Sequence, residues 1–89
     1  MKVTIGEKGL KYSWQNEFPK TIECCQCGGT SRIGFVAHEG MDKADLKIPH
    51  ICGLHDSKGK GNFWLHDCCT VAVYFCRDCL EPTALYNQG

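Results

Sequence analysis

The sequence predicts a small, β-rich domain that bound metal ions hold together, with little helix. Three observations support this fold class. The chain has 89 residues, so it forms one domain whose apolar core is marginal. Eight residues are cysteine and four are histidine, and most of them stand in pairs. The segments beside these pairs are rich in β-branched and aromatic residues, which favour strands. We call such a domain metal-stapled, because the ions add the stability that a small core lacks.

Charge and hydropathy exclude several classes of protein. Ten basic and ten acidic residues give a formal net charge of zero, and no block of like charge indicates a polyanion-binding face. No apolar stretch approaches the ~18 residues of a membrane helix, so we expect no membrane partner. The first residues lack the apolar region of a secretory signal. We therefore expect a cytoplasmic protein whose cysteines are metal ligands or redox thiols instead of disulfides.

We divide the chain into three parts. Residues 1–20 form an N-terminal arm, which is irregular apart from a short strand at residues 3–5 and which packs its aromatic side chains onto the domain. Residues 21–82 form a zinc-binding domain. Pro82 ends regular structure, and residues 83–89 form a C-terminal tail.

Two strands are expected inside the domain. Residues 32–38 form the first, with Ile33 and Phe35 on one face and Val36 on the other. Residues 70–75, Thr-Val-Ala-Val-Tyr-Phe, form the second. This second strand is apolar on both faces, which predicts a central position in a sheet.

Four pairs of candidate ligands share one spacing, with two residues between the members. Such a pair forms a small turn that directs both donor atoms to one point, about 2.3 Å from a metal for sulfur and about 2.0–2.1 Å for imidazole nitrogen. Four pairs supply two tetrahedral sites, so we expect two zinc ions per chain, or at least one. The pairs are Cys24/Cys27, Cys52/His55, His66/Cys69 and Cys76/Cys79.

The predicted strand at residues 70–75 limits which pairs share an ion. At about 3.3 Å per residue its ends stand ~20 Å or more apart, so the pairs that flank it bind different ions. Two arrangements remain. The nested arrangement joins Cys24/Cys27 to Cys76/Cys79 and Cys52/His55 to His66/Cys69, whereas the crossed arrangement exchanges the two partners. We favour the nested one, because a short loop closes its inner site and short loops close at lower entropic cost.

Two of the pairs lie in motifs that resemble the knuckles of zinc-ribbon and rubredoxin-like domains. These motifs are Cys-Cys-Gln-Cys-Gly-Gly at residues 24–29 and Phe-Cys-Arg-Asp-Cys-Leu at residues 75–80. In those families two knuckles, each at the end of a β-hairpin, hold one ion through four thiolates. The resemblance covers the knuckles and their strands, and it implies that Cys24, Cys27, Cys76 and Cys79 are the ligands of such a site. Two departures from the families' pattern are the doubled cysteine, which lets Cys25 replace Cys24, and the lack of a glycine after Cys79.

The second site would contain Cys52, His55, His66 and Cys69. Here Cys68 competes with Cys69, and in an alternative interpretation the histidines are loop residues and the cysteines are buried thiols. Four leftover residues are interpreted as packing or surface residues: Cys25, Cys68, His38 and His50. Four spaced pairs also resemble cross-brace modules such as RING, although the gap between the second and third pairs is longer here.

Zinc is the expected metal, with rubredoxin-type iron as the alternative, because four thiolates suit both and only zinc readily accepts the mixed second site. Four protein ligands leave no open coordination position, so such zinc is structural. We therefore expect a structural zinc-binding domain that serves as a protein or nucleic-acid interaction module, with no small-molecule substrate evident.

Two other functions remain open. A rubredoxin-like iron electron carrier needs only the four-cysteine site. A metal-dependent hydrolase would need a catalytic acid, and the acid–histidine neighbours that the sequence offers are His38/Glu39 and His66/Asp67. No hydrolase or phosphate-loop motif accompanies them, so we expect no enzymatic activity.

Overall fold

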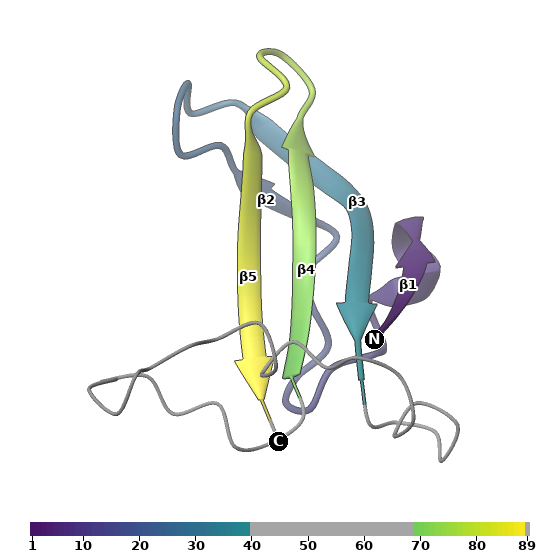
Figure 1. Cartoon of the computed structure of the whole chain (residues 1–89). Coiled ribbons are helices and arrows are strands. Elements are labelled where there is room, and N and C mark those ends of the chain that lie inside the picture. Colours follow the sequence, from purple (N-terminus) through teal and green to yellow (C-terminus); the bar gives the residue numbers. More distant parts are fainter. Residues whose placement is uncertain (40–68, 89) are drawn as a thin grey trace, which may run out of the picture.

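The computed structural model describes residues 1–39 and 69–88, and their strands form one antiparallel sheet (Figure 1). The order of the strands is β1-β3-β4-β5, and β2 also pairs with β3. The predicted β-rich class with little helix is confirmed, since the described residues contain only one short 3₁₀ helix. The elements are β1 (Lys2–Ile5), η1 (Gly6–Gly9), β2 (Thr21–Glu23), β3 (Thr30–His38), β4 (Cys69–Cys76) and β5 (Pro82–Gln88).

β4 is central, as its sequence predicts. It pairs with β3 on one side and with β5 on the other. Its buried side chains alternate, so Thr70, Ala72, Tyr74 and Cys76 face the core, while Val71, Val73 and Phe75 on the outer face are half-buried. The period of two places one face of the strand against packed chain and leaves the other partly open.

A bulge in β3 changes which residues share a face. Ile33 lies opposite Tyr74 and Phe35 opposite Val73, so Gly34 is an extra residue between the two pairs. Ile33 therefore joins the core face, and Phe35 lies on the outer face. The prediction that Ile33 and Phe35 share a face is wrong, because a bulge adds one residue and reverses the alternation.

Glycine is required at the bulge. A Cβ atom on Gly34 would lie 2.5 Å from the ring of Phe75, so this aromatic side chain rests directly on the backbone of β3. The packing of β4 against β3 thus depends on the absence of a side chain at this position.

The N-terminal segment is more ordered than the sequence predicts. The short strand at residues 3–5 is confirmed as β1, which pairs with the later half of β3. The chain then passes behind β4 and β5 in Figure 1, where Leu10 and Phe18 pack with Val36, Ala72 and Tyr74 in the core. The prediction that the rest of the arm is irregular is wrong for η1, a 3₁₀ helix that contacts β3.

Two hydrogen bonds and one stacked ring pair hold this segment to the sheet. The hydroxyl of Tyr74 donates to the backbone oxygen of Pro19 at 2.5 Å. The ring of Tyr12 stacks on His38 with 4.1 Å between centroids, and Thr4 Oγ1 lies 3.0 Å from His38 Nε2. His38 is therefore a buried packing residue, which confirms its interpretation as packing or surface.

The C-terminal segment also extends the sheet. The prediction that Pro82 ends regular structure is wrong, because β5 begins there and runs along β4 as far as Gln88. Proline is tolerated because it is the first residue of a strand at the end of the sheet order. The division of the chain at residues 20 and 82 stays a prediction, but both flanking segments contribute strands to the same sheet.

Within the described ranges, no helix has the length and apolar character needed to cross a membrane.

Candidate metal centre

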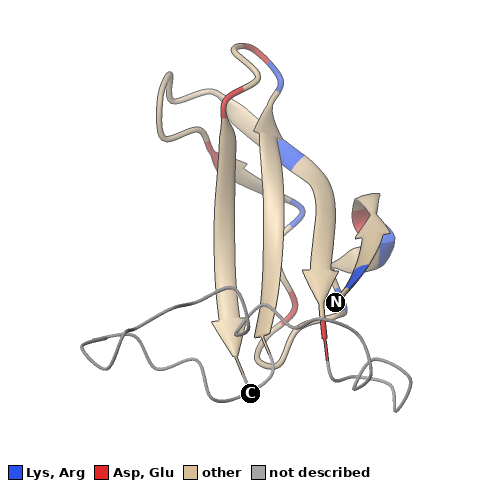
Figure 2. Ribbon diagram, in the orientation of Figure 1, with Lys and Arg blue, Asp and Glu red and all other residues tan. Residues whose placement is uncertain are grey.

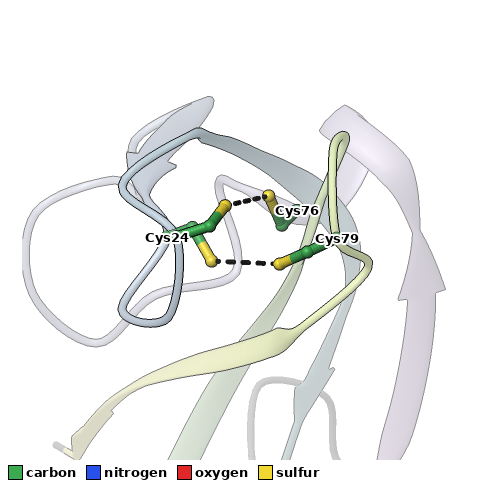
Figure 3. A group of neighbouring side chains, drawn as sticks. Cys24, Cys76 and Cys79 are labelled. Atoms are coloured by element: carbon green, nitrogen blue, oxygen red, sulfur yellow. Dashed lines mark hydrogen bonds between the residues drawn. The ribbon is translucent and has the colours of Figure 1, made fainter.

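Four cysteine sulfurs meet at one end of the sheet. Cys24 and Cys27 lie in the turn between β2 and β3, and Cys76 and Cys79 lie at the end of β4 and in the turn that follows. All four Sγ atoms lie within 4.8 Å of one another. Cys24 Sγ lies 3.6 Å from Cys79 Sγ, and Cys27 Sγ lies 3.5 Å from Cys76 Sγ (Figure 3).

These distances fit a tetrahedral metal ion. Four Zn–S bonds of about 2.3 Å place the sulfurs about 3.8 Å apart. A disulfide requires about 2.05 Å between sulfurs, so the cross-turn distances of 3.6 and 3.5 Å exclude one. All four cysteines are free thiols in the structure.

The two turns that carry these cysteines have the same backbone geometry. In the first turn, Gly28 N donates to Cys24 O at 3.1 Å; in the second, Leu80 N donates to Cys76 O at 2.9 Å. Gly28 and Leu80 both have a positive φ, 76° and 64°. Each turn is also closed by a bond from the first cysteine's N–H to the residue five positions later, Gly29 or Glu81. We call these turns knuckle 1 (residues 24–29) and knuckle 2 (residues 76–81).

Backbone N–H groups in both knuckles point at the sulfurs. Gln26 N donates to Cys24 Sγ and Asp78 N donates to Cys76 Sγ, each at 3.4 Å. In both knuckles, the N–H of the residue five positions after the first cysteine is directed at the second sulfur. Hydrogen bonds to the charged form favour a thiolate, which is the form that binds metal.

The pKa values of the clustered thiols are shifted in opposite directions. N–H groups of its own turn lower the pKa of Cys24. The N–H groups of Cys79 and Asp78 lower the pKa of Cys76 to about 6. At Cys79 the N–H of Glu81 acts in the same direction, but burial and the neighbouring sulfurs raise the pKa to about 12. Several thiolates so close together need a cation between them to compensate their charge.

The knuckles also contact each other directly. Arg77 N in knuckle 2 donates to the oxygen of Thr30 at 3.0 Å, just after knuckle 1. Gly29 leaves no room for a side chain, because a Cβ atom there would lie 2.5 Å from Asp78 Oδ2 and 3.3 and 3.4 Å from Cys27 Sγ and Cys76 Sγ. The backbone of knuckle 1 therefore forms one wall of the cluster.

The structure separates the two adjacent cysteines of knuckle 1. Cys24 is buried in the cluster, whereas Cys25 is exposed and its sulfur lies 3.5 Å from Thr83 Oγ1. The placement of Cys24 and Cys27 beside Cys76 and Cys79 agrees with the nested arrangement and disagrees with the crossed one.

The second predicted site falls largely outside the described residues. Cys52, His55 and His66 lie there, as do Cys68, His50 and Asp67. Cys69 is described, and it lies at the opposite end of β4 from the cluster, buried. Its N–H donates to Glu39 Oε1 at 2.9 Å, and its sulfur lies 3.7 Å from the hydroxyl of Tyr86. Among the described residues, the four-cysteine cluster is the group of potential ligands close enough for one ion.

Comparisons with protein-family models, with curated proteins and with solved structures found no match. The likeness to zinc ribbons therefore depends on the two knuckle motifs and on the cluster they form in a small β-rich fold. This much supports a metal-binding structural module.

Proposed function

We propose that the chain is a zinc-ribbon-like structural module in which Cys24, Cys27, Cys76 and Cys79 hold one zinc ion. The observation that supports this most is the meeting of four sulfurs, from two turns with the same backbone, at tetrahedral spacing. Four thiolates fill the coordination of zinc, so the ion has no open position for a substrate. The role of the ion is to join the turn between β2 and β3 to the turn between β4 and β5.

The energetic reason for a metal is the size of the core. Only five residues form the buried hydrophobic cluster among the described residues: Leu10, Phe18, Val36, Ala72 and Tyr74. Structural zinc contributes about 10–16 kcal/mol of apparent binding free energy in finger peptides at neutral pH. Such a contribution exceeds what a core of this size supplies alone.

The outer face of the sheet supports a protein partner over a nucleic acid. Val3 and Ile5 of β1 are 55% and 72% exposed, and Tyr86 of β5 is 43% exposed. By their register, these side chains share the outer face with Phe35 and Val71. An apolar exposed face is typical of protein contacts, whereas nucleic-acid interfaces are strongly basic. We place the module in the cytoplasm, where a reducing environment keeps the thiols free.

Metal analysis of the purified protein, combined with chelation, tests the zinc proposal. We expect zinc in at least one equivalent per chain, and loss of the folded-state circular dichroism when a strong chelator removes it. Two equivalents of zinc per chain would support the second predicted site as well, with Cys52, His55, His66 and Cys69 as ligands. Metal-free protein that stays folded would overturn the proposal. A visible absorbance that dithionite bleaches would instead favour an iron-containing electron carrier.

A further inference from the structure

A pocket of about 510 Å³ opens at one edge of β3, beside knuckle 2. This volume lies in the range typical of small-molecule sites. Its walls come from the start of η1, the start of β2, the first half of β3 and the segment from the end of β4 into knuckle 2. Of the four clustered cysteines, Cys76 is the one that lines the pocket.

The pocket exists because two short strands share one edge of β3. β1 pairs with residues 35–38 and β2 with residues 30–32, so neither covers the bulge at Ile33 and Gly34. This leaves a notch in the sheet edge. Thr21, Arg32 and Phe75 are successive cross-strand partners beside the notch, and all three line the pocket.

Three cations and one carboxylate surround the notch. Lys20, Arg32 and Arg77 line it with Glu7, which gives a local charge of about +2 at neutral pH. Figure 2 shows basic positions on β3 and in the β4–β5 turn at this end of the molecule. Arg77 Nε lies 3.9 Å from Asp78 Oδ1, but both side chains are about 60% exposed, and an exposed pair of this kind contributes little.

Lys20 and Arg32 are available for a ligand. Both are exposed, and neither forms an ion pair with any acidic group among residues 1–39 and 69–88. The guanidinium of Arg32 can present two parallel N–H donors, a geometry that matches phosphate oxygens.

The other walls of the pocket are apolar. Ile33 and Phe75 are half-buried, and Leu80 is 72% exposed at the rim. An inorganic anion would leave these walls in contact with water. A ring attached to the anion would cover them, and contact with the aromatic side chain would favour a planar ring.

We propose that this pocket binds a phosphate monoester that carries a planar ring. A phosphate monoester has a charge of about −1.5 to −2 at pH 7, which complements the local charge of the notch. Arg32, Arg77 and Lys20 bind the phosphate, and Phe75 and Leu80 contact the ring. This ligand class goes beyond the structural zinc role, and the sequence offers no sign of it because the three cations come from separate segments.

The experiment is a titration of the metal-loaded protein by NMR at constant ionic strength. The probes are inorganic phosphate, phenyl phosphate, adenosine monophosphate and phosphotyrosine. We expect saturable shifts of the Thr21 amide and of the Arg32 and Arg77 Nε–H signals, with phenyl phosphate binding more tightly than inorganic phosphate. Tighter binding of adenosine monophosphate identifies a nucleotide as the source of the phosphate, and tighter binding of phosphotyrosine identifies a modified protein side chain.

A charge-matched pair of variants makes the test specific. Arg32→Gln weakens phenyl phosphate binding by about tenfold or more, since it removes charge-assisted hydrogen bonds. Lys11→Gln is the control, because Lys11 lies over the Tyr12 ring in the segment that packs on the core face. Equal weakening by both variants, or no saturable shift with any probe, would overturn the proposal. Zinc content is measured on the same samples, so that failure of the metal site is distinguished from failure of the pocket.

Discussion

Knuckle 1 and knuckle 2 have the same hydrogen bonds but different residues at the position that most constrains the backbone. Gly28 has φ 76° in knuckle 1, and Leu80 has φ 64° in the equivalent place of knuckle 2. Glycine adopts this region without cost, whereas a residue with a Cβ atom is strained there by about 1–2 kcal/mol. The difference teaches that the turn conformation is set by the need to direct backbone N–H groups at sulfur. Knuckle 2 keeps this conformation although leucine disfavours a positive φ.

The knuckles also differ in what surrounds them. Knuckle 1 follows β2, a strand of three residues, whereas knuckle 2 follows the eight-residue central strand β4. The long strand is paired on both sides, so it positions Cys76 firmly. We infer that the rigidity of β4 maintains the strained turn of knuckle 2, and that knuckle 1 depends more on its glycines.

The largest expected effect comes from the adjacent cysteines of knuckle 1. Cys24→Ser removes a thiolate from the cluster and should lower the free energy of unfolding by about 4 kcal/mol or more. Cys25→Ser changes an exposed side chain and should stay within about 0.5 kcal/mol. Zinc competition with a chromophoric chelator and urea denaturation measure both. If Cys25→Ser released the metal instead, the choice of Cys24 as ligand would be wrong.

A smaller effect on stability is expected at Gly29 in knuckle 1 and at Glu81 in knuckle 2, which occupy equivalent positions. Gly29→Ala places a Cβ atom against Asp78 and two sulfurs, so it should weaken zinc affinity and cost about 1–3 kcal/mol. Glu81→Ala is the matched change in knuckle 2 and should stay within about 0.5 kcal/mol, because only the Glu81 backbone takes part in the turn. Equal losses in chelator competition would show that the two turns do not differ in how closely they pack.

The smallest effects concern the residues with positive φ, and they have opposite signs. Gly28→Ala introduces strain and should destabilise the protein by about 1–2 kcal/mol. Leu80→Gly relieves strain, but it increases the entropy of the unfolded chain, so the net gain is about 0.5–1 kcal/mol. Thermal unfolding of the zinc-loaded proteins measures both. A loss of stability in Leu80→Gly would mean that the Leu80 side chain contributes contacts which outweigh the strain.

The sequence predicts part of the fold, for reasons visible in particular residues. Residues 70–75 are apolar on both faces and rich in β-branched and aromatic residues, a pattern typical of a central strand, and β4 is central. β5 is not predicted, because Pro82 indicates the end of regular structure, although the first position of a strand accepts proline. Simple alternation also places Ile33 and Phe35 on one face, which the register shift between them contradicts. Gly34 was the available signal, since an isolated glycine within a strand pattern often marks a bulge.

The candidate metal centre is also predicted only in part from the sequence. The spacing of two residues grouped the cysteines into pairs, and the length of β4 excluded a shared ion between the pairs at its ends. Spacing alone left Cys24 and Cys25 as alternatives, because a shift of one residue keeps a plausible turn. The phosphate pocket has no local signature, since it depends on where β1 and β2 end along β3.

The separation of the two knuckles along the chain has a consequence for biosynthesis. Cys27 and Cys76 are 49 positions apart, so a ribosome releases the first pair of thiols well before the second. A nascent chain with only Cys24 and Cys27 offers two donors, which hold an ion far less firmly than four. The four-cysteine cluster can form only after β4 and the turn that follows it have emerged, and until then the early thiols are exposed to oxidants and to competing metals.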